Sequence, residues 1–387
     1  MANLLIIAST FPRWKNDSTP AFVYRIAKAL AEKLKVVVLA PYSKGAKTQE
    51  KDGQLIIYRF KYWFNKGNNL ADGGIMANLK KRPWLVIQVP FFCLAELIAT
   101  IKLIKKEKIT VIHAGWMIPQ GLTALIINRF YKIKYLVTIF GGDMFPFKTN
   151  NRLWLWLYQL IIQKSSYVTT VNQAFLKYLN KIDDQKVIYI PNIVKIEKLK
   201  YKSKTKNILF VGRLVEKKGL KYLLEALTKI DKKQYQKLLV VGDGPLKNIL
   251  EQQAVKLKLE TKVKFLGNVN FNQLLKLYQE SMMLVVPSII PKGGDIEGFP
   301  TVYLDAMANN CPIVTTNIEG IESMIKNQQT GLVVEQKSSK TLAKAISLLI
   351  NNQTLRDTLA KNALKEAKKK YLQGVVGEQY IKLIRNL

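Results

Sequence analysis

Cysteine is nearly absent from this 387-residue sequence, which contains only Cys93 and Cys311. Both lie in apolar surroundings, and neither belongs to a pair with the spacing of metal ligands. A disulfide-stabilised secreted domain is therefore excluded, and both residues are predicted to lie in the core of a reduced, cytosolic protein. No cluster of histidine, cysteine and acidic residues resembles a metal site, so we expect no tightly bound metal or other cofactor.

Acidic residues are also scarce. The 27 Asp and Glu face 61 Lys and Arg, which gives a formal charge of +34 and predicts anionic partners. Zinc-finger spacing, an RNP-type aromatic strand and a basic helix followed by heptads are all missing, so nucleic acid is the weaker candidate. Phosphorylated small molecules and an anionic membrane surface remain, and part of the charge reflects a general preference for Lys over Arg.

Long hydrophobic runs are limited to one segment, Trp84 to Ile101. It approaches membrane-spanning length but contains Gln88, Pro90 and Glu96, which argues against a spanning helix. Its basic flanks, at residues 80–82 and 102–106, favour a helix at a membrane interface. We expect its apolar stripe to face the protein core and its lysine-rich ends to face lipid. The predicted location is cytoplasmic, peripheral on the inner face of the cell membrane.

The length exceeds what one hydrophobic core usually supports, about 250 to 300 residues, and predicts two domains. Short β-branched runs alternate with amphipathic helical segments in both halves, which is typical of parallel α/β sheets. Residues 195–206 are charged, lack an apolar period and resemble a linker. The prediction is an α/β protein with two Rossmann-like domains, 1–194 and 195–370, and a C-terminal helix at 371–387 that packs back on the first domain. The predicted strands are 4–8, 35–40, 55–58, 111–113, 135–140, 167–171 and 187–190, then 207–211, 237–241, 263–266, 284–286, 313–315 and 331–334.

Two turns in the second half follow predicted strands. The first presents Gly212, Arg213 and Lys218 before a helix, where free backbone amides and the helix dipole favour an anion such as a diphosphate. A basic turn in a Lys-rich protein is the simpler alternative. The second turn contains Gly242 and Gly244, which permit a tight turn and close approach of the backbone to a ligand. It also fits an ordinary turn.

The most informative segment is the glycine-rich loop 293–299, which leads into a helix starting at Pro300. The amides of Thr301 and Val302 are predicted to bind a phosphate, and the carboxylates of Glu297 and Asp305 to accept hydroxyls. Two solvated acids near a helix start would be the simpler interpretation. The apolar neighbours of Asp305 argue against it.

These motifs together resemble the retaining glycosyltransferase family 4, whose members have the GT-B fold. The family signature of two acids separated by seven residues matches Glu297 and Asp305, and its Gly-Arg-Leu-x-x-x-Lys-Gly turn matches residues 212–219. A Gly-Asp-Gly-Pro turn at 242–245 is a further match. The first half resembles the more variable acceptor domain of the family, through segments 10–14, 20–23, 112–114 and 141–143.

The resemblance implies two domains facing across a cleft, with the second binding a nucleoside diphosphate sugar and the first an acceptor. It implies Arg213 and Lys218 on the diphosphate, Glu297 on the sugar and Asp305 on the ribose hydroxyls. The remaining predicted donor-binding residues are Gly212, Gly242, Gly244, Gly298, Phe299, Pro300, Thr301 and Val302.

Three departures from the family pattern stand out. Asp305 replaces the usual Glu, Phe140 stands where the family often has His, and residues 18–21 replace a glycine-containing loop. On the acceptor side the candidates are Arg13 and His113, the only histidine, for which a structural role is equally favoured. Asp143 follows a Gly-Gly turn at a strand end and is a catalytic candidate.

The predicted reaction is transfer of a hexose-type sugar from a nucleoside diphosphate sugar to a hydroxyl, with retention at the anomeric carbon implied by the family. The predicted acceptor is a lipid-linked glycan in cell-envelope polysaccharide biosynthesis, at an anionic membrane surface. Two alternatives remain. One is a catalytically silent sugar-nucleotide sensor or scaffold, to which Phe140 and Asp305 point. The other is a basic nucleic-acid-binding protein.

Overall fold

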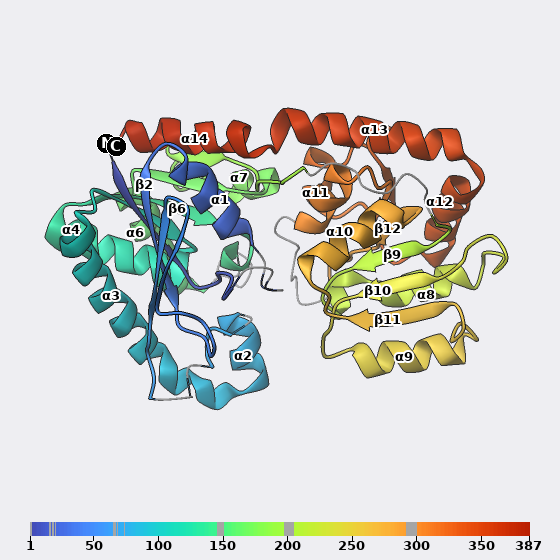
Figure 1. Ribbon diagram of the computed structural model, residues 1–387, viewed down its shortest axis with the longest axis horizontal. Coiled ribbons are helices and arrows are strands. Elements are labelled where there is room, and N and C mark those ends of the chain that lie inside the picture. The colour runs from blue at the N-terminus through green and yellow to red at the C-terminus, as the bar shows by residue number, and fades with distance from the viewer. Residues whose placement is uncertain are drawn as a thin grey trace. The chain divides into compact units, whose positions relative to one another are not determined.

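The computed structural model of the chain describes residues 2–14, 17, 19, 21–64, 67, 69–72, 74–144, 151–196, 205–291 and 300–387. The chain forms two compact units. Unit 1 comprises Met1–Ile193 and Gln373–Leu387, and unit 2 comprises Val194–Leu372. Each unit is an α/β structure built on one sheet (Figure 1).

The sheet of unit 1 contains eight strands. They are β1 (Asn3–Ala8), β2 (Lys35–Pro41), β3 (Gln49–Asp52), β4 (Leu55–Phe60), β5 (Val111–Gly115), β6 (Lys134–Ile139), β7 (Tyr167–Thr170) and β8 (Val187–Tyr189). Their order is β3-β4-β2-β1-β5-β6-β7-β8, and every neighbouring pair is parallel except β3 with β4. The chain moves outward from β1 in one direction and from β5 in the other, so the topological switch point lies between β1 and β5.

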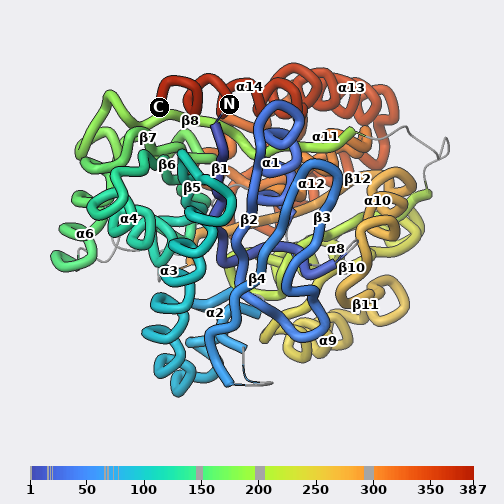
Figure 2. Tube along the Cα trace, turned by 60° about the vertical axis from the view of Figure 1, so that its left-hand side comes forward, coloured from blue at the N-terminus to red at the C-terminus, as the bar shows by residue number. Residues whose placement is uncertain are grey.

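Helices cover both faces of this sheet. They are α1 (Phe22–Ala31), α2 (Ile75–Lys81), η1 (Pro83–Ile87), α3 (Gln88–Glu107), η2 (Met117–Gly121), α4 (Leu122–Tyr131), η3 (Gly142–Met144), α6 (Arg152–Lys164), η4 (Gln173–Phe175), α7 (Leu176–Leu179) and α14 (Gln373–Arg385). Strand residues alternate between two cores. Helices α3, α4 and α6 pack on one face of the sheet, and α1 and α14 pack on the other (Figure 2).

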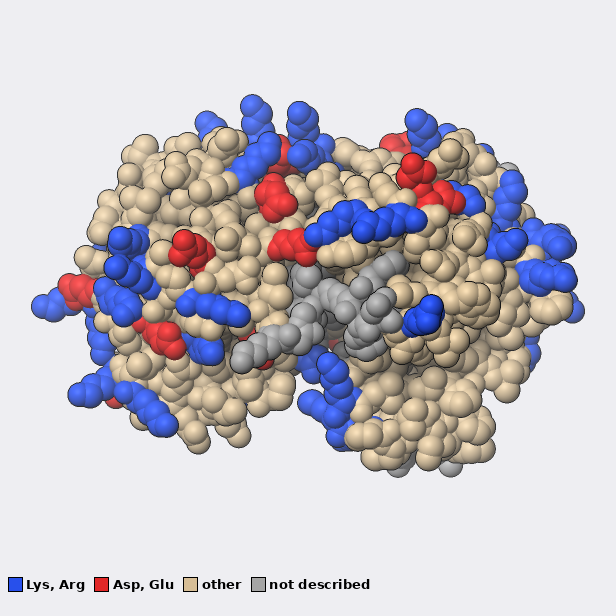
Figure 3. Space-filling view, turned by 180° about the vertical axis from the view of Figure 1, so that it is seen from behind, with Lys and Arg blue, Asp and Glu red and all other residues tan. Residues whose placement is uncertain are grey.

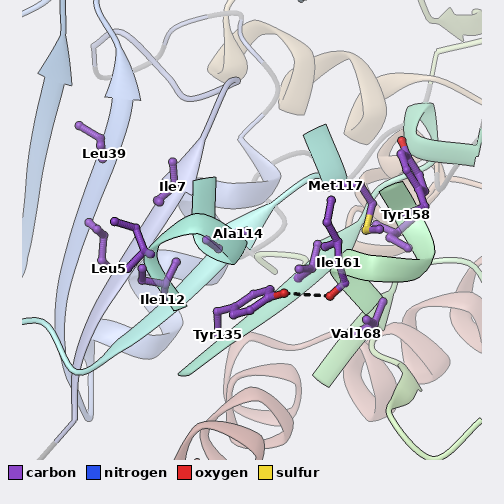
Figure 4. Packing of buried hydrophobic residues seen from close by; sticks show 14 of the residues in the cluster. Leu5, Ile7, Leu39, Ile112, Ala114, Met117, Tyr135, Tyr158, Ile161 and Val168 are labelled. Carbon is purple, nitrogen blue, oxygen red and sulfur yellow. Dashed lines mark hydrogen bonds between the residues drawn. The ribbon is translucent and has the colours of Figure 1, made fainter. Parts of the chain in front are cut away.

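The first of these cores is shown in Figure 4. Leu5, Ile7 and Ile112 of the strands lie in the same cluster as Ile161 of α6. The Tyr135 hydroxyl donates a hydrogen bond of 2.9 Å to the carbonyl oxygen of Ile161, so the one polar atom of this buried ring is satisfied. This packing fixes α6 on the sheet.

Unit 2 contains a six-stranded, fully parallel sheet in the order β11-β10-β9-β12-β13-β14. The strands are β9 (Ile208–Val211), β10 (Leu238–Val241), β11 (Val263–Gly267), β12 (Met283–Val286), β13 (Ile313–Thr316) and β14 (Leu332–Val334). The helical segments are η5 (Glu216–Lys218), α8 (Leu220–Leu227), α9 (Lys247–Lys256), α10 (Phe271–Glu280), α11 (Thr301–Ala308), η6 (Ile321–Ser323), α12 (Ser339–Asn351) and α13 (Gln353–Lys370). Here the switch point lies between β9 and β12.

Helix α3 carries apolar residues on both its core-facing and its outer side. Phe92, Leu103 and Ile104 lie in the core of unit 1, as expected, and the polar residues Gln88, Glu96 and Thr100 are buried beside them. Phe91 and Leu94 are 47% and 56% exposed, so a second set of apolar residues faces outward, which the sequence-based expectation did not include. Gln120 and Thr123 each donate a 2.8 Å hydrogen bond to the Glu96 carboxylate, which makes the polar face acceptable inside the protein.

Helices η1 and α3 together form the segment Pro83–Glu107, which by length and composition could cross a membrane. In its most apolar stretch of 18 residues, 28% is buried inside the protein. Leu85, Phe92 and Leu103 nevertheless lie in the core of unit 1. The segment is thus an integral part of this unit, with an unusually apolar outer face.

Candidate active site

The predicted donor-binding residues that the structure describes lie at the carboxyl ends of β9, β10 and β12. Strand β9 lies between β10 and β12 in the sheet. The amide of Leu214 donates to the Asp243 carbonyl at 2.9 Å, and the amide of Ile289 donates to the Lys217 carbonyl at 2.8 Å. Three loops from separate parts of the sequence are therefore joined at the switch point. Ligands of doubly wound sheets bind in the crevice outside this edge.

Gly242 and Gly244 make the close approach of two of these loops possible. Gly242 has a φ of +125°, and a Cβ there would lie 2.1 Å from the Gly212 carbonyl oxygen. A Cβ on Gly244 would lie 2.4 Å from the carbonyl oxygen of Leu214. These glycines are required by backbone packing, so both the ligand-binding and the plain-turn interpretation have a structural basis.

The two predicted cations of this edge have different environments. Arg213 is exposed, and its guanidinium forms no ion pair or hydrogen bond with the residues that the structure describes. Lys218 is buried, and its aliphatic stem lies against Gly212, where a Cβ would approach the Lys218 Cδ to 3.2 Å. Packing of the stem directs Lys218, whereas Arg213 is available to an anion from solvent.

Helix α11 begins beside this edge. Pro300 is its N-cap and accepts a hydrogen bond of 3.2 Å from the Tyr303 amide, while the amides of Thr301 and Val302 donate to no other described residue. First-turn amides of this kind bind anions. Asp305 is half-buried one turn further along.

Sequence reasoning missed two features around α11. Asn309 closes its C-terminal end. The side-chain Nδ2 of Asn309 donates to the Asp305 carbonyl at 2.8 Å, and the Gln279 Nε2 donates to the Asn309 Oδ1 at the same distance. The Ser288 hydroxyl, in the loop after β12, is fully buried and has no hydrogen-bond partner among the residues that the structure covers. In the sequence, the only indication of this serine was a Pro-Ser pair directly after a strand.

The predicted residues Glu297, Gly298 and Phe299 lie outside the described residues.

In unit 1, Asp143 ties two loops together at the carboxyl edge of the sheet. Its carboxylate accepts hydrogen bonds from the amides of Met117, at 3.1 Å, and Phe140, at 3.2 Å. Burial raises the pKa of Asp143 to about 7, against the opposing effect of these amides. The geometry favours a positioning role, in which Asp143 orders the loops after β5 and β6.

His113 lies inside β5 and faces α14. Its Nε2 is 2.6 Å from the Thr138 hydroxyl, which is 2.6 Å from the Thr169 hydroxyl, and the Tyr380 ring packs on the imidazole at 5.3 Å. Burial lowers the pKa of His113 to about 3, so the ring is neutral at physiological pH. Of the two roles left open by the sequence, this geometry favours the structural one.

Arg13 and Phe140 lie at opposite sides of the switch point of unit 1. Arg13 pairs with Asp17 at 2.6 Å and stacks on Trp14 at 4.4 Å, so its charge is already partnered. Phe140 packs against Phe22 and Trp116 at 4.7 and 5.0 Å. An aromatic cluster thus stands where a histidine is common in the resembled family.

Arg59 organises the loop that follows β1 and was not identified from the sequence. Its buried guanidinium donates to the carbonyls of Pro12 and Lys47, at 2.8 and 2.9 Å, and pairs with Glu50 at 2.6 Å. A buried cation with several acceptors is strongly fixed. It holds the loop that carries Arg13.

Comparisons with known proteins agree with this arrangement. Residues 20–198 match the family described as Glycosyltransferase Family 4, and residues 193–366 match Glycosyl transferases group 1. An uncharacterized glycosyltransferase of Methanocaldococcus jannaschii is 35% identical over 166 residues, which are 43% of this chain and 41% of that protein.

A second relative is an α-1,4-N-acetyl-D-galactosaminyltransferase of Campylobacter jejuni, whose full name describes a glycan on PP-undecaprenol. It is 31% identical over 180 residues, which are 46% of this chain and 47% of that protein. The chain thus spans less than half the length of these two relatives.

Among solved structures, Anabaena HepE in complex with UDP-glucose superposes with a TM-score of 0.73 at 16% identity, covering 99% of each chain. This similarity shows the GT-B fold. The two family matches overlap at residues 193–198 and together extend from residue 20 to residue 366. The chain belongs to the group 1 and family 4 glycosyltransferases and has the GT-B fold.

Proposed function

We propose that this enzyme transfers a hexose-type sugar, with retention, from a nucleoside diphosphate sugar to a hydroxyl of a lipid-linked glycan during synthesis of a cell-envelope polysaccharide. The observation that carries the donor half of the proposal is the switch point of unit 2. There the exposed Arg213, the packed Lys218 and the first amides of α11 lie at one edge of the sheet. Positive charge and oriented amides at one edge suit a diphosphate.

Catalysis on this proposal is stabilisation of the leaving diphosphate. Arg213, Lys218 and the Thr301 and Val302 amides compensate the charge that develops as the sugar bond breaks, and the leaving phosphate helps to deprotonate the acceptor hydroxyl. Removing one such donor of hydrogen bonds typically costs about 10² to 10³ in rate. Glu297 is assigned to the donor sugar and Asp305 to the ribose hydroxyls.

The membrane half of the proposal is supported by the outer surface of α3. Its exposed residues are apolar through Ile98, and Lys102, Lys105 and Lys106 follow in its last turns. An apolar face with cations at its ends suits the interface of an anionic bilayer. We assign the enzyme to the cytoplasmic face of the cell membrane as a peripheral protein, where a lipid-linked acceptor is accessible.

A nucleotide-sugar screen tests the proposal. Thermal shift of the purified protein against a panel of UDP, GDP, TDP and ADP sugars should identify one donor, and a transfer assay with undecaprenyl-linked glycans should then show turnover. Glu297→Gln and Arg213→Ala should each nearly abolish transfer in a folded protein. Donor binding without transfer or donor hydrolysis would instead favour a sensor or scaffold. Affinity for nucleic acid that falls steeply with salt and ignores nucleotide sugars would favour the other alternative.

A further inference from the structure

A second apolar surface occurs on α6. In its first turns Leu153, Trp154 and Trp156 are 71%, 40% and 58% exposed, and in its later turns the exposed residues Gln159 and Gln163 are polar. Large hydrophobic groups clustered on one part of a surface indicate an interaction site. The sequence-based membrane assignment did not include this helix.

The exposed parts of α3 and α6 lie at the same end of unit 1. Helix α4 contacts both of them and stands between them (Figure 2). The three helices connect the parallel strands β4, β5, β6 and β7, so all begin at the carboxyl edge of the sheet. The first turns of α4 between them present the half-buried apolar residues Leu122, Leu125 and Ile126.

The positive charge around this apolar surface indicates which partner binds there. Lys and Arg are more widespread than Asp and Glu on the face of the molecule shown in Figure 3. Helices α2, η1, α4 and α6 contain no Asp or Glu at all, and in α3 Glu96 is buried and Glu107 pairs with Lys35 at 3.0 Å. A second copy of this chain would place cations against cations. Lipid phosphates complement them, and Trp residues favour the boundary between head groups and acyl chains.

We propose that η1 and the N-terminal parts of α3 and α6 form one membrane-inserting surface, the α3–α6 face, made of Trp84, Ile87, Phe91, Leu94, Leu153 and Trp156. Unit 1 then meets an anionic bilayer with the carboxyl edge of its sheet tilted toward the lipid. The polar ends of both helices, with Lys102 to Lys106 and Gln163, lie farther from the acyl region. The inference deepens the proposed function, on which its biological purpose rests, because it brings the switch point between β1 and β5 close to lipid-anchored acceptors.

Vesicle flotation of the full chain tests this geometry. The test variant is L153E/W156E, and its matched control is Q159E/Q163E, which makes the same charge change on later turns of the same helix. A second control is F130E, because Phe130 is 75% exposed but lies at the far end of α4. With vesicles of phosphatidylcholine and 30% phosphatidylglycerol, we expect L153E/W156E to bind at least about 10-fold more weakly than wild type. Both controls should stay within about 3-fold.

A depth measurement supplements the binding assay. Brominated lipids should quench part of the tryptophan fluorescence of the wild type on these vesicles, and Trp156→Phe should remove a measurable share of the quenched emission. Circular dichroism and thermal melting show that each variant is folded. Equal loss of binding in Q159E/Q163E, or loss in F130E as large as in L153E/W156E, overturns the tilted orientation.

Other results distinguish this inference from a dimer interface and from failure of the proposed function. A wild-type dimer that L153E/W156E converts to a monomer, with vesicle binding unchanged, overturns the lipid assignment in favour of a second copy. Vesicle binding is measured without donor, so it is independent of transfer. Normal turnover of a detergent-solubilised acceptor together with undiminished binding of L153E/W156E would refute this inference alone. Absence of any donor turnover would refute the proposed function alone.

Discussion

We expect the buried carboxyl of Glu96 to make unit 1 less stable at neutral and alkaline pH than at acidic pH, and Glu96→Gln to relieve this cost. Glu96 is fully buried, and no cation is found among its hydrogen-bond partners, Gln120 and Thr123. Burial raises its pKa from 4.5 to about 7, against the effect of these two donors. The folded state therefore favours the neutral carboxyl, while the unfolded chain ionises from about pH 4.5 upward.

The direction and size of the effect on stability follow from the coupling between protonation of Glu96 and folding. The folded pKa lies above the unfolded one, so the native state loses stability as the pH rises from 4.5 to 7 and stays at the lower value above that range. The folded and unfolded pKa values differ by about 2.5, and each pKa unit corresponds to about 1.4 kcal/mol. The resulting loss in the free energy of unfolding is about 3 kcal/mol at pH 8 and about 1 kcal/mol at pH 5.

The replacement amide finds partners in the same place. The Thr123 hydroxyl still donates to the remaining oxygen, and the Gln120 Oε1, which is buried and has no partner among the described residues, becomes an acceptor once that amide is turned. Glu96→Gln thus removes a buried charge and leaves the number of unsatisfied groups unchanged, because the turned Gln120 places its Nε2 where its Oε1 had no partner. We expect it to raise the free energy of unfolding of unit 1 by about 3 kcal/mol at pH 8.

Urea unfolding followed by tryptophan fluorescence measures this effect. All six tryptophans lie in unit 1, so the signal reports that unit alone. The matched control is Glu107→Gln on the same helix: hydrogen bonds from Tyr58 and Lys35 lower the pKa of Glu107, and its removal should destabilise at pH 8. A gain for Glu96→Gln that is equal at pH 5 and pH 8, or a loss at pH 8, would refute the reasoning.

Three further predictions concern unit 2. Arg213→Ala and Lys218→Met should each lower kcat/KM about 10² to 10³-fold in a steady-state transfer assay, with melting temperatures near wild type for Arg213→Ala. Gly242→Ala should destabilise unit 2 by at least about 2 kcal/mol, because φ is +125° and the new Cβ meets the Gly212 carbonyl; calorimetry of the purified protein measures this cost. Asp305→Glu should retain or improve donor affinity in titration calorimetry, whereas Asp305→Asn should weaken it, and the reverse order would contradict the ribose assignment.

The strands were predictable because each is a short apolar run between turns. Every strand expected from the sequence has a counterpart, including 207–211 as β9 and 331–334 as β14. Strand β3 was missed because its sequence, Gln-Glu-Lys-Asp, contains no apolar residue. It forms as an antiparallel edge beside β4, where pairing of the backbone and not burial of side chains decides the structure.

The candidate site was predictable only where the sequence itself carries the constraint. Gly242 and Gly244 mark turns that tolerate no side chain, and the structure gives the reason. His113 remained ambiguous, because its neighbour Tyr380 comes from the distant α14. The same holds for Arg59, whose acceptors belong to loops after β1 and β2. Long-range partners of this kind leave no signal in a local pattern.

Helix α3 shows most directly why a local pattern does not give the environment of a buried polar residue. The groups that bond its buried polar residues, the Gly67 carbonyl for Gln88 and the side chains of Gln120 and Thr123 for Glu96, lie in other segments. Because the core-facing and exposed sides of α3 serve different purposes, they should be separable by mutation. Glu96→Gln should change the stability of unit 1 and leave vesicle binding unchanged.

Leu94→Glu, on the exposed stripe of the same helix, should give the opposite pair of results. Leu94 is 56% exposed, so its replacement removes little packing and should shift the free energy of unfolding by less than about 0.5 kcal/mol. It places a charge in the proposed lipid contact and should weaken flotation with anionic vesicles several-fold. If Leu94→Glu instead destabilises unit 1 as much as a core substitution does, the outer stripe is packed in solution and does not serve the membrane.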